Sequence, residues 1–350
     1  MKKQRYTLIA AMASLLFISC DKISPTGILI AEIAVEDRIK MSYEYFYRYM
    51  EDEREIYAPD QDEYTFLVGA DSHLTNDDGR LREMMQNSLD YDDLLMTHLG
   101  DIADTKAEYY LRLEDLLTEY KKKWARKHYK TVFVGDEDDP SQVISDDFYF
   151  YIDTVTNTPY ALGDLKYPFY PVVGNHDITH SGWALWANIF HTSFYSIYVI
   201  VSEEQDKRIV DNFIFLDTAN ATLGREQVSL IEQDVLTPDE QAEIGLQVRH
   251  TFVFSHTSIF HVSSTELTSS FAREETYFLL NQFKKWNVNI AFFGHVHEWD
   301  ERRNGNTQFL TLETMCEKNN PRPGDYLVRV HVKKDGTLSW ERVHMNYTKP

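Results

Sequence analysis

The chain has 350 residues, of which 43% are hydrophobic and 14% aromatic, and this is enough to bury the core of one large domain. Its formal net charge of -21 argues against a nucleic-acid polymer as its partner, because such a partner normally requires a basic surface. Most of the acidity is explained by solubility.

The N-terminal residues have the pattern of a bacterial lipoprotein leader. Residues 1–5 are mostly basic, residues 8–18 are apolar, and the sequence that ends at Cys20 resembles a lipobox. The apolar stretch is too short to span a bilayer comfortably as a mature helix. We therefore expect a signal peptide over residues 1–19, lipidation of Cys20, and an extracytoplasmic protein that this anchor holds on the periplasmic side of a membrane or at the cell surface. The alternative is an ordinary secretory signal with an incidental cysteine. Only Cys316 remains elsewhere, so the mature domain can form no intramolecular disulfide.

A segment over residues 20–62 separates this leader from the main domain, which we expect over residues 63–350. Apolar side chains recur at helical spacing from Ile39 to Met50. This spacing predicts a helix that packs on the domain, in preference to one that binds a partner. After the first strand, residues 80–89 predict another helix.

Five runs rich in β-branched and aromatic residues predict buried strands, and each is followed by a short block of metal-binding residue types. Because the loops beyond the carboxyl ends of strands converge in an α/β protein, the five blocks can share one site. The runs are residues 64–70, 94–99, 168–173, 251–254 and 288–293, and the blocks are Asp71-Ser72-His73, Gly100-Asp101-Ile102-Ala103-Asp104, Gly174-Asn175-His176-Asp177, Ser255-His256 and Gly294-His295-Val296-His297.

A long stretch between the second and third blocks predicts an insert over about residues 105–165. It contains an amphipathic helix near residues 106–128, an acidic loop at residues 135–140 and an aromatic run at residues 148–151. The acidic loop lacks the alternating ligands of an EF-hand, so a solvated turn is favoured over a calcium site. The insert could lie over the crevice formed by the five blocks and select its ligand.

Aromatic residues are concentrated again after the third block. Trp183 and His180 could stack on a bound ligand or close a core, and the second outcome is the more common one. Nearer the C-terminus, residues 325–345 predict a hairpin that turns at Asp335-Gly336 and completes one sheet.

The five blocks supply a mixed donor set of two carboxylates, one amide oxygen and four imidazoles, with no thiolate. Such a set suits two divalent transition-metal ions, with Mn, Fe, Zn and Co as the candidates. A single Asp-x-His or His-x-His pair is common without a metal. Five blocks in one order after five strands indicate a metal centre.

From residue 63 to residue 301, the blocks together resemble the calcineurin-like metallophosphoesterase family. The resemblance implies a four-layer αββα sandwich of two mixed β-sheets, with a dinuclear metal site at the strand-end loops. It also implies that Asp101 bridges the two ions. The implied ligands of the first ion are Asp71, His73, Asp101 and His297, and those of the second are Asp101, Asn175, His256 and His295.

The resemblance further implies an enzyme that hydrolyses a small phosphate ester, either a monoester or a diester. The implied nucleophile is a hydroxide that bridges the two metals. His176 is the implied general acid for the leaving oxygen, and Asp177 and Asp104 are expected to fix the orientation of imidazoles.

Three departures locate the chain within the family. Thr257 follows His256 where many relatives have a proline, no arginine follows Asp104, and the third block ends in Asp177 where the Ser/Thr protein phosphatases have a glutamate. The chain is more similar to the cyclic-nucleotide phosphodiesterase and broad phosphoesterase branches. The alternative is a non-catalytic metal-binding scaffold or interaction lipoprotein of the same fold. The presence of His176 together with every implied ligand argues against that alternative.

Overall fold

The computed structural model of the protein describes residues 34–49, 55–58, 61–104, 106–133, 149–154, 156–165, 167–204, 207–233, 235–260, 271–316 and 325–346. The predicted leader with Cys20 and the acidic loop at residues 135–140 lie outside these ranges. Within them, no helix combines the length and the apolar character needed to cross a membrane.

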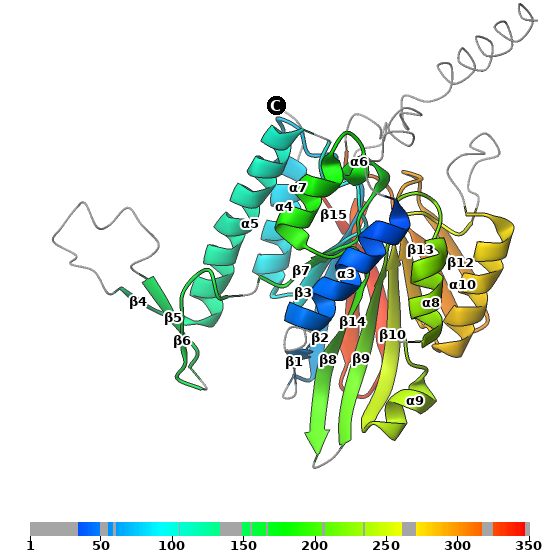
Figure 1. Ribbon diagram of the computed structural model, residues 1–350. Coiled ribbons are helices and arrows are strands. Elements are labelled where there is room, and N and C mark those ends of the chain that lie inside the picture. The colour runs from blue at the N-terminus through cyan, green and yellow to red at the C-terminus, as the bar shows by residue number, and fades with distance from the viewer. Residues whose placement is uncertain are drawn as a thin grey trace, which may run out of the picture.

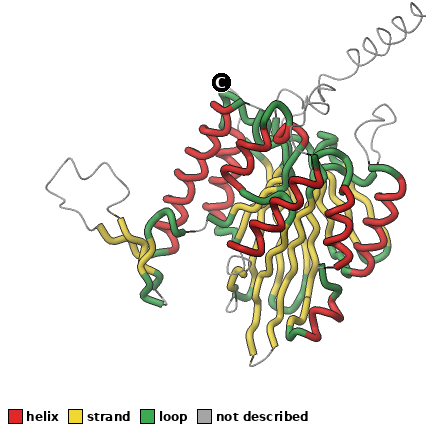
Figure 2. Tube along the Cα trace, viewed as in Figure 1, coloured by secondary structure: helices red, strands yellow, loops and turns green. Residues whose placement is uncertain are grey.

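Two mixed β-sheets lie face to face, and helices cover the outer face of each (Figure 1, Figure 2). One sheet has seven strands in the order β1-β8-β9-β10-β11-β13-β12, and the other has five in the order β15-β14-β2-β3-β7. Buried side chains from both sheets fill the space between them. The predicted four-layer αββα sandwich is therefore confirmed.

All five strands expected before the metal-type blocks are present, as β2, β3, β7, β10 and β11. The seven-stranded sheet consists of β1 (Glu55–Tyr57), β8 (Tyr195–Glu204), β9 (Lys207–Leu216), β10 (Leu246–Ser255), β11 (Ile290–Phe293), β12 (Asp300–Asn304) and β13 (Thr307–Thr311). The five-stranded sheet consists of β2 (Glu63–Gly69), β3 (Leu95–His98), β7 (Phe169–Pro171), β14 (Asp325–Lys333) and β15 (Leu338–His344).

Aromatic side chains dominate the contact between the two sheets. Phe66 of β2 meets Phe213 of β9 and Phe252 of β10 edge-on, with ring centroids 5.1 and 5.0 Å apart. Phe66 also meets Phe254 of β10 edge-on at 6.2 Å. Each such pair contributes about 0.5 to 1.5 kcal/mol beyond the burial of its apolar area. This packing fixes the separation of the strand ends that carry the five blocks.

Three helices pack on the outer face of each sheet. The five-stranded sheet is covered by α4 (Gly79–Tyr91), α5 (Ala107–His128) and α7 (Gly182–Phe190). The seven-stranded sheet is covered by α3 (Val35–Tyr49), α8 (Gly224–Gln233) and α10 (Arg273–Lys285). The short helices α6 (Asn175–Ile178) and α9 (Pro238–Glu243) lie in connections between strands. The helices predicted near residues 80–89 and 106–128 are confirmed as α4 and α5.

The segment before the first block contributes to both a sheet and an outer layer. Val35 and Ile39 of α3 are buried in the cluster that covers the seven-stranded sheet. β1 pairs in parallel with β8 and extends the same sheet. The predicted helix thus packs on the domain, and the sandwich begins before residue 63.

The insert forms α5 and a separate sheet of β4 (Lys130–Phe133), β5 (Tyr149–Ile152) and β6 (Pro159–Tyr160). This sheet lies beyond the C-terminal end of α5, away from the end of the sandwich that carries α6 (Figure 1). The expectation that the insert covers the crevice is therefore wrong for its described residues. The physical reason is the apolar stripe of α5, which packs along the five-stranded sheet and carries the chain away from the blocks.

A buried carboxylate joins the two sheets at the end remote from the blocks. Asp211 of β9 accepts hydrogen bonds from the Tyr64 hydroxyl at 2.6 Å and from Arg249 Nε at 3.0 Å, and it faces His250 Nδ1 at 2.8 Å. Arg249 also donates to the carbonyl of Lys333 in the predicted hairpin, which is confirmed as β14 and β15. Burial would raise the pKa of Asp211, but the hydrogen bonds from His250 and Arg249 outweigh it and lower the pKa. The ionised carboxylate therefore ties one sheet to the other.

Candidate metal centre

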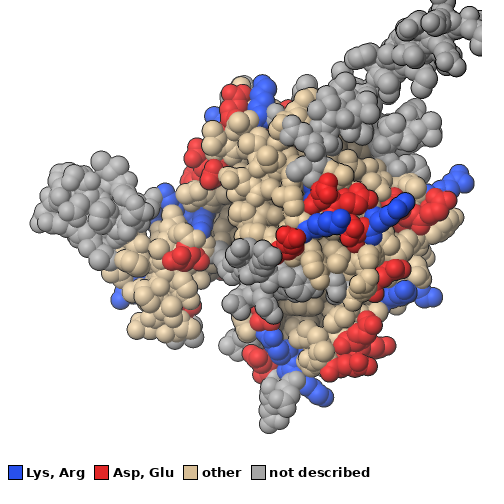
Figure 3. Space-filling model, viewed as in Figure 1, with Lys and Arg blue, Asp and Glu red and all other residues tan. Residues whose placement is uncertain are grey.

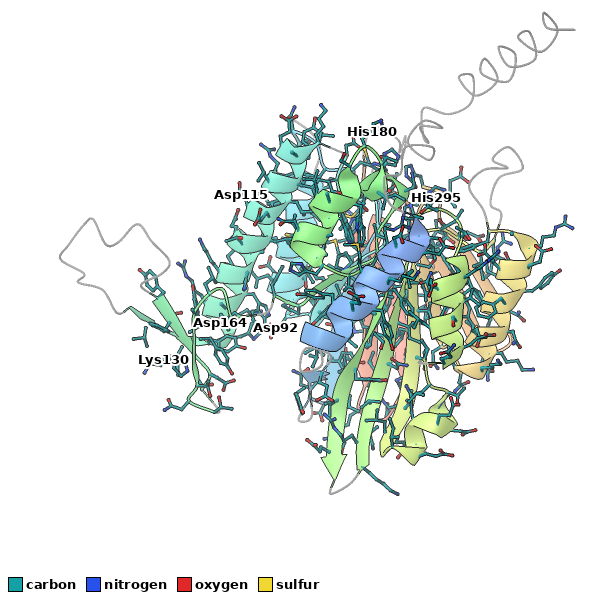
Figure 4. The ribbon with its side chains drawn as sticks, in the orientation of Figure 1. Asp92, Asp115, Lys130, Asp164, His180 and His295 are labelled. Carbon is teal, nitrogen blue, oxygen red and sulfur yellow. The ribbon has the colours of Figure 1, made fainter. Side chains whose placement is uncertain are left out.

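Five strand-end loops bring the blocks to one end of the sandwich. His295 marks this end near the top of the seven-stranded sheet in Figure 4. Three groups of side chains there each have ligand atoms within 4.8 Å of one another. Two of them share Asp101, and the remaining group, His73, Asp104 and His176, overlaps the first of these two through His73. The first set is Asp71, His73, Asp101 and His297, and the second is Asp101, His256 and His295.

The first set lies between the two sheets and is almost fully buried. His73 Nε2 is 3.4 Å from His297 Nε2 and 3.7 Å from Asp101 Oδ2. His297 Nε2 is in turn 3.3 Å from Asp71 Oδ1. Three residues of this set come from the loops after β2 and β3, and His297 comes from the loop after β11.

The second set is built in the same way around His256. The Nε2 atom of His256 lies 2.9 Å from Asn175 Oδ1, 3.1 Å from His295 Nδ1 and 3.6 Å from Asp101 Oδ1. Asn175 thus joins this set through its amide oxygen. The structure brings all seven predicted ligands together at one end of the sandwich, and their assignment to two ions stays a prediction.

Tautomers assigned from neighbouring acceptors leave lone pairs that point into both sets. His256 Nδ1 lies 2.7 Å from the carbonyl oxygen of Leu99, so Nδ1 carries the proton and Nε2 presents a lone pair. In the neutral, metal-binding form of His73 the proton would likewise lie on Nδ1, 3.3 Å from Asp104 Oδ1, and leave the lone pair on Nε2. Lone pairs that face carboxylate and amide oxygens repel one another unless a cation lies between them. The residues therefore fit two divalent transition-metal ions.

The charges of the cluster also favour a cation. Burial lowers the pKa of His73, but the hydrogen bond to Asp104 and the charges of Asp101 and Asp71 outweigh it and raise the pKa to about 9, so a metal ion bound at Nε2 would displace a proton from this ring. Burial would raise the pKa of Asp101, yet the surrounding imidazoles hold it well below its usual range. Burial lowers the pKa of His295 to about 3, so this imidazole is neutral at pH 7 and offers a lone pair.

Five of the seven residues adopt left-handed backbone conformations. Such conformations are uncommon outside glycine and concentrate at functional sites. Here they occur in the loops that follow strands, at residues whose ligand atoms come together in the two sets. The φ angles are 53° for Asp71, 43° for His73, 52° for Asp101, 68° for His295 and 62° for His297.

Two glycines of the blocks are required by close approach between neighbouring loops. A Cβ atom on Gly174 would overlap the backbone nitrogen of Asp101. A Cβ atom on Gly294 would lie 2.6 Å from Asp71 Oδ2. These positions explain the glycine at the start of the third and fifth blocks, because any larger residue would separate the carboxylates from the imidazoles.

Asp177 does not orient an imidazole, so this part of the sequence prediction is wrong. Its Oδ2 accepts hydrogen bonds from the backbone N–H groups of Asp101 and Gly174, both at 2.8 Å. Its Oδ1 accepts from the Tyr110 hydroxyl at 3.0 Å and from the N–H groups of Ile102 and Ala103. Burial and the charge of Asp101 raise its pKa, but backbone N–H groups can only donate, so the site requires an acceptor. Asp177 instead holds the loop that presents Asp101.

Asp104 lies between two imidazoles, as predicted. Its Oδ1 is 3.3 Å from His73 Nδ1 and 3.7 Å from His176 Nδ1. The rings of His73 and His176 meet edge-on with centroids 4.7 Å apart. The side chain of His176 is 26% exposed, so it is accessible at the rim of the site.

The two candidates from the aromatic-rich stretch after the third block, Trp183 and His180, differ in their burial. Trp183 is buried in the cluster beneath α7 and closes the core. His180 is exposed at the same end of the molecule as the blocks (Figure 4). Only His180 is therefore placed where a ligand could reach it.

Sequence reasoning missed two hydroxyl groups that support the site. One is that of Tyr110, which reaches Asp177 from α5. The other is that of Thr218, which accepts the N–H groups of His256 and Thr257, both at 3.0 Å. The available signal for Thr218 was its place directly after β9, a further strand that ends at the same edge.

No protein-family model matches the chain, and no curated protein matches it. Among solved structures, it is similar to a dimetal phosphatase from Danio rerio, with 12% identity and a TM-score of 0.46 over 81% of this chain and 99% of that one. It is also similar to GAP50, the anchor in the inner membrane complex of Plasmodium, with 13% identity and a TM-score of 0.43 over 83% and 91% of the two chains. A third is a novel archaeal phosphodiesterase, with 9% identity and a TM-score of 0.35 over 80% and 99%. These likenesses are too distant to carry an argument about activity, which rests on the side chains of this protein.

We expect Asp177→Asn to weaken Mn²⁺ binding by about 10- to 100-fold, the usual range for groups that orient metal ligands. The new amide nitrogen would face N–H groups that require an acceptor, so the loop of Asp101 would lose its shape. Titration calorimetry measures the effect. Tyr110→Phe removes one of the five donors to Asp177 and should cause a smaller loss. Wild-type affinity in Asp177→Asn would show that the carboxylate does not hold the loop.

Proposed function

We propose that the protein hydrolyses small phosphate esters with the help of two divalent transition-metal ions. The observation that carries the proposal is the convergence of seven oxygen and nitrogen donors from five loops, with Asp101 shared between two sets. Bound ions would activate water and polarise the phosphoryl oxygens. In this proposal Asp71, His73, Asp101 and His297 hold one ion, and Asp101, Asn175, His256 and His295 hold the other.

His176 is the proposed proton donor to the leaving oxygen. Its backbone N–H donates to Asp101 Oδ1 at 2.7 Å, which fixes the residue at the edge of the proposed metal sites. The carboxylate of Asp104 lies on the Nδ1 side of its ring. That carboxylate would orient the ring with Nδ1 toward Asp104, so that Nε2 is the atom that would give its proton to the leaving oxygen.

The proposed substrate is a small ester, with monoesters and diesters both open. The net charge of -21 opposes a nucleic-acid polymer. On the face drawn in Figure 3, Lys and Arg side chains are interspersed with Asp and Glu, which supports a small substrate drawn in by the metal ions.

Removal of metal should abolish the activity. We expect chelator-treated protein to lose hydrolysis of p-nitrophenyl phosphate and bis-p-nitrophenyl phosphate and to regain it with Mn²⁺. Metal analysis should show that Asp101→Ala loses both ions, because Asp101 belongs to both sets, whereas His295→Ala keeps one. Full hydrolysis in metal-free protein would contradict the proposal. Two bound ions without hydrolysis of any ester in a broad panel would favour the scaffold alternative.

The role of His176 predicts a dependence on the leaving group. His176→Ala should retain both ions and lose about 10²- to 10⁴-fold in turnover on alkyl or nucleoside esters, which have poor leaving groups. The loss should be much smaller on p-nitrophenyl esters, because their leaving group needs little protonation. Rates are measured across a series of leaving-group pKa values at constant metal content. A uniform loss across the series would show that His176 positions the substrate or stabilises its oxygens.

We also propose that the protein is a lipoprotein, anchored outside the cytoplasm through Cys20. The basic start, the short apolar stretch and the lipobox-like sequence support this address. The anchor would supply membrane affinity only, since the site lies in the sandwich.

In a Gram-negative host, the full chain should incorporate labelled fatty acid and partition with membranes, whereas Cys20→Ala should do neither. A chain that starts after residue 20 should be active without membranes. Cys316→Ala is the matched control, because it removes the other cysteine and should leave labelling unchanged. Equal labelling of wild type and Cys20→Ala would exclude lipidation at Cys20.

A further inference from the structure

The helix that precedes the metal-type blocks is connected to the metal centre through a buried ion pair. Arg38 of α3 donates from Nε to Asp217 Oδ2 and from Nη2 to Asp217 Oδ1, each at 2.9 Å. Both side chains are 0% exposed. Arg38 also donates to Asn220 Oδ1 at 2.8 Å. This bidentate pair fixes the position of Asp217 at the end of β9, because the planar guanidinium matches the carboxylate in only one orientation.

The backbone of Asp217 is fixed independently by α8. Its N–H donates to Gln227 Oε1 at 2.9 Å, and its carbonyl accepts from Gln227 Nε2 at 2.7 Å. Asp217 is therefore held through both its backbone and its side chain. Because Asp217 is held in this way, the position of the next residue, Thr218, is fixed as well.

Thr218 transmits this position to the fourth block through a fully satisfied hydrogen-bond network. Its hydroxyl accepts the N–H groups of His256 and Thr257, both at 3.0 Å, and lies 2.9 Å from Ser255 Oγ. Ser255 Oγ donates to the carbonyl of Thr257 at 3.0 Å, so the Thr218 hydroxyl must donate to Ser255. Thr257 Oγ1 donates back to the Thr218 carbonyl at 2.7 Å. With every polar group paired and buried, the network allows one arrangement of His256.

We propose that α3 is a positioning element of the metal centre, acting through Arg38, Asp217 and Thr218 on His256 and hence on the second of the two proposed ions. The inference rests on the proposed metal centre, in which His256 is a ligand of that ion alone. The hydrogen bonds traced above end on His256, and none of them ends on Asp71, His73 or His297. Loosening α3 should therefore weaken the second ion selectively. The segment between the predicted anchor and the blocks would then serve the site as well as the fold.

The test measures binding of Co²⁺ to full-length protein by calorimetry and by the visible absorption of the bound ion. Wild type should bind two ions, and His295→Ala, which lacks a donor of the second set only, gives the reference isotherm for a weakened second ion. Arg38→Met should weaken the second ion by about 10-fold or more and leave the first unchanged. Arg38→Lys, which keeps the charge but not the two-point geometry, should lie between Arg38→Met and wild type.

A second buried pair provides a matched control. Arg329 donates from Nε and Nη2 to the two oxygens of Asp93 at 2.9 and 3.1 Å, and the side chains are 5% and 0% exposed. Asp93 lies before β3, whereas Asp101 follows it, so this pair sits at the opposite end of the sheet. Arg329→Met should lower the urea midpoint about as much as Arg38→Met does, yet bind both ions like wild type.

Thr218→Val tests the last step without burying an unpaired charge, and it replaces Arg38→Met if that variant does not fold. It should also weaken the second ion selectively. Binding of both ions with wild-type affinity in Arg38→Met or Thr218→Val would overturn the proposal, and so would an equal weakening of both ions in Arg38→Met. A wild type that binds two ions but hydrolyses no ester would contradict the proposed function alone. A wild type that binds no Co²⁺ would overturn both.

Discussion

The candidate metal centre depends on left-handed backbone at the ends of strands. Asp71, His73, Asp101, His295 and His297 all have φ between 43° and 68°, a conformation that costs a residue with a side chain about 1 to 2 kcal/mol. In return, this backbone conformation brings the donor side chains together at the ends of the buried strands. Isolated loops would not keep this left-handed backbone, because its conformational free energy is unfavourable. The surrounding structure must hold them, and most of the polar network at this end of the sandwich does so.

The loops are held mainly by one another. Both oxygens of Asp71 accept the N–H of His295, at 3.1 and 3.0 Å, which joins the first block to the fifth. The N–H of His73 donates to the carbonyl of Asp101 at 2.9 Å, which joins the first to the second. Asp177 joins the third block to the second, because its carboxylate accepts hydrogen bonds from the backbone N–H groups of Asp101 and Gly174. A carboxylate such as Asp71 thus fixes a neighbouring loop while it faces a ligand imidazole. Donor positions and loop shapes cannot be changed separately.

The difference between the donor residues and the residues that hold the loops explains which parts of the site could be predicted from the sequence. The donors are visible because each follows an apolar run and belongs to a residue type with metal chemistry. The order of their blocks resembles one known family, and that resemblance implied the sandwich and the seven candidate ligands. The role of Asp177 could not, since a carboxylate beside a histidine suggests an imidazole partner, and only the path of the chain shows that backbone N–H groups surround it. Thr218 and Arg38 were missed for a related reason. A hydroxyl and a helical arginine are ordinary residues, and their contacts span 38 and 179 positions of sequence.

Both proposed ions would lie across the two sheets, and this gives the site a structural as well as a chemical role. Asp71, His73 and Asp101 follow strands of the five-stranded sheet, whereas His297 follows a strand of the seven-stranded one. In the second set two residues follow strands of each sheet. At the remote end the sheets are already joined, because ionised Asp211 accepts from Tyr64 of the opposite sheet. At the near end the lone pairs of the imidazoles and the carboxylate oxygens repel one another, and a cation between them would draw them together. Bound ions would therefore add to the hydrogen bonds that already join the two sheets at this end, such as that from the His295 N–H to Asp71, and their binding energy would appear in part as stability of the fold. The aromatic core between the sheets sets the distance between the ligands of one sheet and those of the other. Metal affinity and core packing would therefore both depend on the separation of the two sheets.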